Sequence, residues 1–176
     1  MAENFLIRDG EIDDARKINE ILNWYIENTH FTFDVDLWSD AARAEWLADK
    51  FFSKANLNRP RHFLVVAEQD GDISGFCYNS AFRPKDAYAS SCETTIYLNP
   101  HYKTPSLADR LYTQLFQLIQ DTDLHRAYAG IAQPNPASVG FHCKHGFEQV
   151  GIFTDVGYKF GRFYDVYWYE KKLTPA

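Results

Sequence analysis

Glu93 is the residue whose position in this sequence most suggests chemistry. It lies in SSCETTIYL, residues 90–98, where the alternation predicts a strand with Glu93, Thr95 and Tyr97 on one face. A carboxylate in a strand just before a ligand-binding turn can act as a general base. The other interpretation is a strand glutamate that faces solvent or a lysine.

Asn135, Ser138 and His142 follow one another at helical spacing in NPASVGFHCKHG, residues 135–146. Positions i, i+3 and i+7 lie on one face of a helix, so the three polar side chains can approach the same ligand. Gly146 can end this helix in the left-handed conformation. For His142 the alternative is a partly buried structural histidine.

The turn NPHYKTPSLADRL, residues 99–111, joins the strand to a helix and suggests a phosphate site without glycine. A helix start offers free N–H groups and about half a positive charge. Thr104 is a suitable N-cap, and Pro105 removes no donor that the helix needs. The candidate anion-binding residues are Lys103, Thr104, Ser106, Leu107 and Ala108. Asp109 would satisfy the same dipole and repel phosphate, so a plain capped helix remains the alternative.

The elements that must position these residues follow from the hydrophobic periodicity. We expect a strand at 4–8, helices at 9–28 and 39–52, a hairpin at 62–82 that turns at 69–72, a strand at 90–98, a helix at 105–121, a strand at 126–132, a helix at 135–146, and two strands in 147–173 that break at 159–161. The segment 94–120 and the strand after it form a parallel crossover unit. This order predicts an α/β (α+β) fold whose mixed sheet carries helices on both faces, in a single domain spanning 1–176.

The composition narrows the class of protein further. The 176 residues are 45% hydrophobic and 16% aromatic, which favours a folded globule. The net charge is -6 without a block of Lys or Arg, which argues against nucleic acid. Cys77, Cys92 and Cys143 are odd in number and widely spaced, which argues against a disulfide framework or a metal site and suits a reducing cytoplasm. We expect no signal peptide and no membrane segment.

Four stretches resemble the GCN5-related N-acetyltransferases (GNAT), and among them the phosphinothricin acetyltransferase-like subfamily. They are FRPKDAY, CETTIYLNP, NPASVGFHCKHGFEQVG and VGYKFGRFYDV, and the resemblance covers nearly the whole chain. It implies the GNAT fold, with a mostly antiparallel central sheet, and acetyl-CoA as co-substrate. The family's acetyl-CoA loop falls on residues 103–108, where Ser106 stands in place of an expected glycine.

The resemblance also implies roles in acyl transfer, which needs a base, a stabilised oxyanion and a leaving thiolate. Glu93 matches the family's general base. A backbone N–H around Tyr97 or Leu98 would stabilise the oxyanion, where the family's strand splays from its neighbour. Asn135 and Ser138 would contact the CoA arm, and His142 would lie near its sulfur.

The substrate residues are implied by loops that flank the amine pocket in the subfamily. Arg83 could hold a carboxylate with two parallel hydrogen bonds, or it could form a surface ion pair. An apolar wall is expected from Phe31, Phe33, Tyr88 and Phe160. The resemblance also implies a homodimer, with the turn at 159–162 near the partner's site.

Three functions remain open on the sequence. The first is an acetyl-CoA-dependent N-acetyltransferase acting on the α-amine of methionine sulfone, methionine sulfoximine or phosphinothricin. The second is an acyltransferase for another amine, such as a peptide N-terminus or a polyamine. The third is a non-catalytic GNAT relative, which Ser106 and Asp109 would explain and which the retained Glu93, Asn135 and Ser138 argue against.

Overall fold

The computed structural model describes residues 5–58, 60–102 and 106–173. Its elements are β1 (Leu6–Asp9), η1 (Ile12–Asp14), α1 (Ala15–Asn28), α2 (Asp40–Phe51), α3 (Lys54–Asn58), β2 (Leu64–Gln69), β3 (Asp72–Ala81), η2 (Asp86–Tyr88), β4 (Ser91–Leu98), α4 (Leu107–Gln120), β5 (Arg126–Ala132), α5 (Pro136–Lys144), β6 (Glu148–Lys159) and β7 (Arg162–Lys172). The predicted order of strands and main helices is confirmed. The short helix α3 was not expected.

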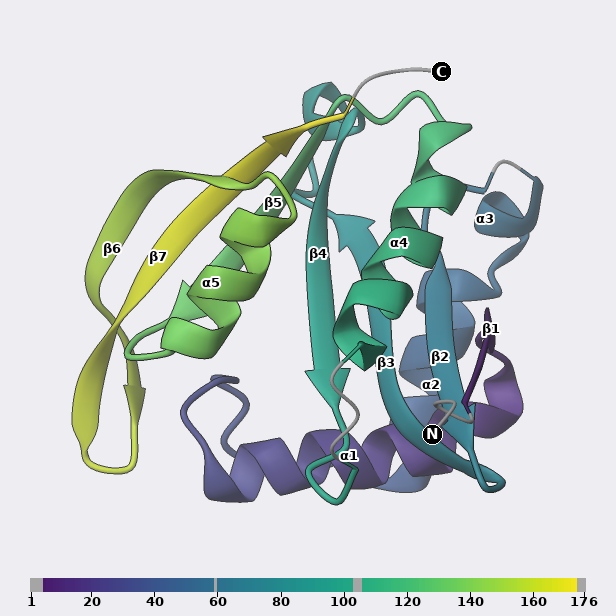
Figure 1. The fold of residues 1–176 in the computed structure, drawn as a ribbon, viewed down its shortest axis with the longest axis horizontal. Coiled ribbons are helices and arrows are strands. Elements are labelled where there is room, and N and C mark those ends of the chain that lie inside the picture. Colours follow the sequence, from purple (N-terminus) through teal and green to yellow (C-terminus); the bar gives the residue numbers. More distant parts are fainter. Residues whose placement is uncertain (1–4, 59, 103–105, 174–176) are drawn as a thin grey trace.

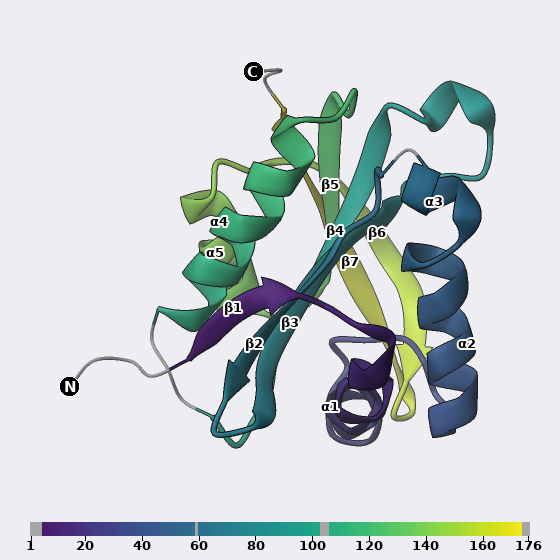
Figure 2. The same cartoon turned by 90° about the vertical axis from the view of Figure 1, so that its right-hand side faces the viewer.

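The strands form one mixed sheet with the order β1-β2-β3-β4-β5-β7-β6. Neighbouring strands run antiparallel except β4 and β5, which are parallel. Helices α1 and α2 cover one face, and α4 and α5 cover the other (Figures 1 and 2). The predicted mixed, mostly antiparallel sheet with helices on both faces is therefore confirmed.

Each face of the sheet is held by its own apolar cluster. Ile18 and Leu22 of α1 pack with Leu47 of α2 on one side. Leu111 and Leu115 of α4 pack on the other. The period of about 3.6 residues places these side chains on the sheet-facing stripes of their helices.

The start of α4 differs from its prediction. The helix begins at Leu107, and Ser106 is its N-cap, so the expected cap at Thr104 is wrong. Leu107 is fully buried, and its packing accounts for where the helix begins. Lys103, Thr104 and Pro105 lie outside the described residues, as does their predicted contact with an anion.

The pairing of β4 with β5 covers only one end of β4. The paired residues run from Ser91 with Arg126 to Glu93 with Tyr128. Beyond Glu93, β4 keeps its pairing with β3 as far as Leu98, but it has no partner residue in β5. The two strands therefore part just after Glu93, and this opening forms the candidate site.

Candidate active site

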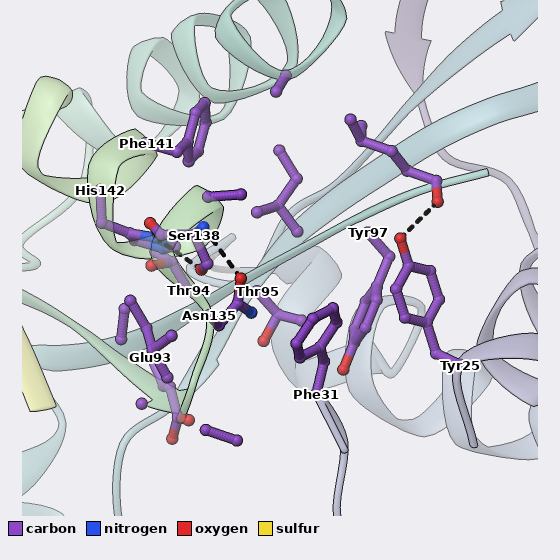
Figure 3. A pocket seen from close by; sticks show the side chains of 18 of the residues that line it. Tyr25, Phe31, Glu93, Thr94, Thr95, Tyr97, Asn135, Ser138, Phe141 and His142 are labelled. Carbon is purple, nitrogen blue, oxygen red and sulfur yellow. Dashed lines mark hydrogen bonds between the residues drawn. The ribbon is translucent and has the colours of Figure 1, made fainter. Parts of the chain in front are cut away.

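A cavity of about 540 Å³ lies where β4 and β5 part. Residues of β4 and β5, both termini of α5 and the end of α1 meet around it (Figure 3). Its wall is formed by Tyr25, Phe31, Tyr78, Glu93, Thr94, Thr95, Ile96, Tyr97, Leu98, Ala108, Ala129, Gly130, Ile131, Ala132, Asn135, Ala137, Ser138, Phe141 and His142. The crossover therefore brings Glu93 and the polar positions of residues 135–142 to one cavity.

Glu93 stands at the point where the two strands diverge. It pairs with Ser80 of β3 and with Tyr128 of β5, and its side chain is half-buried. Burial raises the pKa of Glu93, and the positive charges of Arg83 and Lys50 oppose part of that rise. A carboxylate with a raised pKa is a stronger base than a surface glutamate.

The hydrogen bonds of β4 distinguish between the two candidate oxyanion donors. The N–H of Asn99 donates to the carbonyl oxygen of Ser74 in β3, at 2.9 Å. Because N–H groups alternate between the two edges of a strand, the N–H of Tyr97 lies on the β3 side and that of Leu98 faces the opening. The hydroxyl of Tyr25 donates to Leu98 O at 2.9 Å and holds this end of β4 in place. Leu98 therefore fits the predicted role, and Tyr97 contributes its side chain to the wall.

Asn135 caps the N-terminus of α5. Its Oδ1 accepts a hydrogen bond from Ser138 N at 3.1 Å, so the side chain is the N-cap of the helix. Within the described part of the chain, its Nδ2 donates no hydrogen bond. Asn135 and Ser138 both line the cavity, as the helical spacing required.

His142 is held by hydrogen bonds at both ring nitrogens. Its side chain is 4% exposed, with Nδ1 2.8 Å from Ser138 O and Nε2 2.9 Å from the Tyr112 hydroxyl. A carbonyl can only accept, so Nδ1 carries the proton, and Nε2 then accepts from Tyr112. Burial also lowers the pKa of His142, because a buried site disfavours the charged ring. These contacts argue against His142 as proton donor to a thiolate and favour the structural alternative.

The first turn of α4 approaches the cavity at one residue. Ala108 lines the wall, whereas Leu107 lies in the core. The Asp109 carboxylate contacts Lys144 Nζ at 2.6 Å and His145 Nε2 at 2.9 Å. The hydrogen bond from Lys144, followed by that from His145, lowers the pKa of Asp109. Its negative charge is thus paired with the C-terminal end of α5.

One of the four predicted wall aromatics lines the cavity, namely Phe31. Phe33 instead packs against β6, where a Cβ on Gly157 would lie 2.1 Å from its ring. Tyr88 makes an edge contact with Phe82, and Phe160 is 57% exposed on the β6–β7 turn. The presence of aromatic residues in these loops did not predict which of the loops lies next to the cavity.

Arg83 lies outside the cavity wall but near Glu93. Its guanidinium is exposed and stacks over the rings of Phe82 and Trp168, at 4.2 and 5.5 Å from their centroids. Its charge is the first of the two that oppose the rise in the pKa of Glu93. Arg83 does not share the cavity wall with Glu93, so its predicted contact with an acceptor carboxylate stays a prediction.

A family model described as an acetyltransferase (GNAT) domain matches residues 7–168. The chain belongs to the GNAT acetyltransferases. It is 38% identical over 167 residues to a phosphinothricin N-acetyltransferase of Streptomyces coelicolor, and the match covers 95% of each chain. It is 28% identical to an L-methionine sulfoximine/L-methionine sulfone acetyltransferase of Pseudomonas aeruginosa, over 97% of this chain and 95% of the relative.

Solved structures agree with the family. A crystal structure of a GNAT phosphinothricin acetyltransferase from Sinorhizobium meliloti, in complex with AcCoA, has a TM-score of 0.86 at 27% identity and covers 98% of this chain and 93% of that one. An N-acetyltransferase from Staphylococcus aureus has a TM-score of 0.87 at 28% identity, over 98% of this chain and all of that one. The predicted resemblance is therefore confirmed.

The sequence did not reveal every residue at this GNAT site. Tyr25 lies in the helix predicted at 9–28 and Tyr78 in the hairpin predicted at 62–82, and both line the cavity. Lys50, at the end of α2, lies near Glu93. A contact between a helix and a strand that lie far apart in the sequence has no local sequence signal.

Metal ligation and membrane insertion can be judged for residues 5–58, 60–102 and 106–173. They contain no cluster of His, Cys, Asp and Glu side chains placed to hold a metal ion. None of their helices combines the length and the apolar character needed to cross a bilayer. Cys77 and Cys92 are buried free thiols, and Cys143 is an exposed one.

Proposed function

We propose that this chain acetylates the α-amine of a small amino-acid analogue of the methionine sulfone, methionine sulfoximine or phosphinothricin type. The names of the relatives support this acceptor class. The observation that carries the proposal is the half-buried Glu93 at the point where β4 and β5 part. A base at that point lies between an open strand edge and a pocket for an amine.

Acetyl-CoA, when bound, supplies the acetyl group as an activated thioester. The open edge of β4 fits such a ligand, since Leu98 offers an N–H for the negative charge that develops on the thioester oxygen. The Nδ2 of Asn135, together with Ser138, is suited to bind the CoA arm. The amides of Ser106, Leu107 and Ala108 at the start of α4 suit its phosphates, together with Lys103 and Thr104.

On the acceptor side, Glu93 takes the proton from the acceptor's ammonium group, directly or through a water molecule. Arg83 binds the α-carboxylate, because its planar fork matches a carboxylate and its charge lies near Glu93. Phe31 and Tyr97 cover the apolar part of the acceptor. His142 acts as a positioning residue that fixes α5 against Tyr112 and β4.

Two measurements test the proposal. Calorimetric titration with acetyl-CoA should give saturable binding, and its complete absence would favour a non-catalytic relative. Release of CoA should then be followed with methionine sulfone, phosphinothricin, spermidine and a short peptide as acceptors. We expect turnover with the first two, whereas turnover confined to spermidine or the peptide would refute the acceptor class.

We also propose a homodimer that forms through the β6 edge. β6 ends the sheet order, and large apolar side chains are exposed on β6, on β7 and on the turn between them: Val150, Ile152, Phe153, Val156, Tyr158, Phe160 and Phe163. Such a surface favours association. Light scattering should give twice the chain mass, and Phe163→Asp should reduce the measured mass.

The free thiols suit the reducing cytoplasm, which we propose as the location.

A further inference from the structure

A second cavity, of about 420 Å³, lies at the end of α2. It is lined by Asp49, Lys50, Ser53, Ala55, Asn56, Arg61, His62, Ser80 and Ala81, and we call it the α2 groove. Two contacts connect it with the candidate active site. Ser80 of the groove is the register partner of Glu93, and Lys50 Nζ lies 5.2 Å from the ring centroid of Tyr78, which lines the first cavity.

The groove carries one positive charge without an ion-pair partner. Lys50 Nζ lies over the rings of Trp46 and Tyr78, at 4.6 and 5.2 Å from their centroids. In the described part of the chain, no carboxylate lies within ion-pair distance of it. Arg61, by contrast, is paired with Asp123. A half-buried cation next to an open groove is suited to an anion.

Hydrogen bonds of Asn56 hold together the wall of the α2 groove. Asn56 Nδ2 donates to Phe51 O and His62 O, at 3.0 and 2.8 Å, and its Oδ1 accepts from the N–H groups of Arg61 and His62. Asn56 thereby ties the end of α2 to the segment that leads into β2. These hydrogen bonds fix the wall of the groove, and the rings of Trp46 and Tyr78 position the Lys50 ammonium group beside it.

We propose that Lys50 and the α2 groove bind the far end of the acceptor's side chain and select acceptors that carry an anionic oxygen group there. This inference rests on the proposed function. An acceptor whose amine lies at Glu93 can extend its side chain past Tyr78 to Lys50, because Ser80 of the groove is the register partner of Glu93 and Lys50 Nζ lies over the Tyr78 ring. A phosphinate brings a negative charge to this ammonium group, whereas a sulfone brings neutral oxygens. The cation therefore favours the phosphinate.

The test compares kcat/KM for phosphinothricin and for methionine sulfone in wild type, Lys50→Met, Lys50→Arg and Lys172→Met. Methionine keeps a long flexible stem over the two rings and removes the charge. A charge-assisted contact predicts that Lys50→Met lowers the phosphinothricin-to-sulfone ratio about tenfold to a hundredfold. Lys50→Arg should keep most of the ratio. Lys172→Met, on an exposed strand end, should keep all of it.

Two results would overturn the inference. An unchanged phosphinothricin-to-sulfone ratio of kcat/KM in Lys50→Met means that the groove does not contact the anionic group at the far end of the side chain. An equal loss for both acceptors means that Lys50 acts on Glu93 or on the shared α-carboxylate. If Lys50→Met lowers the melting temperature, Lys50→Gln replaces it.

A binding readout keeps this question apart from the proposed function. Each acceptor is titrated into CoA-saturated wild type and Lys50→Met. If wild type acetylates neither acceptor, the proposed function fails, but tighter binding of phosphinothricin that is lost in Lys50→Met still supports the groove. Equal affinities for the two acceptors in wild type would overturn it.

Discussion

Replacing Glu93 with glutamine tests the proposed chemistry most directly. Glutamine keeps the size of the side chain between β3 and β5 but cannot accept a proton at neutral pH. Because burial raises the pKa of Glu93, the native carboxylate is a stronger base than an exposed one. The variant should fold normally and bind acetyl-CoA as wild type does, because Leu98 and the residues of α5 are unchanged.

The loss of a general base predicts that turnover at pH 7 falls by about 10²- to 10⁴-fold, or about 3–5 kcal/mol of transition-state stabilisation. The assay is release of CoA at saturating acetyl-CoA, with methionine sulfone varied from below to above its KM, from pH 5.5 to 9.5. Wild-type kcat/KM should fall on the acid side as Glu93 takes up a proton, with a midpoint above the ordinary carboxyl value. In the variant the carboxylate midpoint should be absent and the rate should follow the free-amine fraction, so that the deficit shrinks as the pH rises.

The matched control is Glu148→Gln, an exposed glutamate at the start of β6, which should keep wild-type turnover. An unchanged rate for Glu93→Gln at pH 7 would refute the reasoning. So would a retained acid limb with the same midpoint, because the titrating group would then lie elsewhere.

Three further variants test other parts of the structure. Arg83→Lys should raise KM for methionine sulfone about tenfold or more without changing acetyl-CoA affinity; equal KM values in steady-state kinetics would remove Arg83 from acceptor binding. Tyr112→Phe takes away the donor to His142 Nε2 and should lower the free energy of unfolding in urea by about 1–3 kcal/mol. Burial would raise the pKa of Asp14, but the hydrogen bonds from Arg8 and from the Glu11 N–H lower it below the ordinary value. Asp14→Asn should therefore cost about 2–3 kcal/mol at pH 7, and the difference from wild type should disappear as the pH falls through the lowered pKa, which acid-range urea melts would measure.

Local patterns were enough for the elements whose structure depends on near neighbours. The Asp70-Gly71 pair predicted the β2–β3 turn, and both residues adopt positive φ, at 53° and 78°. Gly146 ends α5 with a φ of 80°, as expected. Ser39 caps α2 through a hydrogen bond from Ala42 N. In each case one or two residues decide the conformation, so the sequence contains the information.

The start of α4 and the cavity wall depend on contacts that are distant in sequence. Thr104 is a good N-cap by residue type, but the helix begins where Leu107 enters the core. Phe33 is an apolar loop residue like Phe31, yet it packs on Gly157 of β6. Residue propensities predict neither the start of α4 nor the position of Phe33, because both depend on packing against a surface that exists only in the folded sheet.

Alternation along β4 predicted that Glu93 and Tyr97 share a face, but the cavity at the end of this strand is lined by residues of both faces, from Glu93 to Leu98. It did not predict where β5 leaves β4. That divergence turns a backbone N–H of Leu98 into a possible ligand donor, and it arises from the whole crossover rather than from either strand. A site that uses backbone groups where two strands diverge is therefore harder to predict from the sequence than a site formed from side chains.

Asp109 changes the interpretation of the glycine-less turn. Its carboxylate was expected to oppose an anion at the start of α4. It instead contacts Lys144 and His145, so any repulsion it exerts is offset by a neighbouring cation. Screening of this kind leaves the dipole of α4 available to a phosphate. The remaining obstacle is the Cβ of Ser106, which is a steric rather than an electrostatic one.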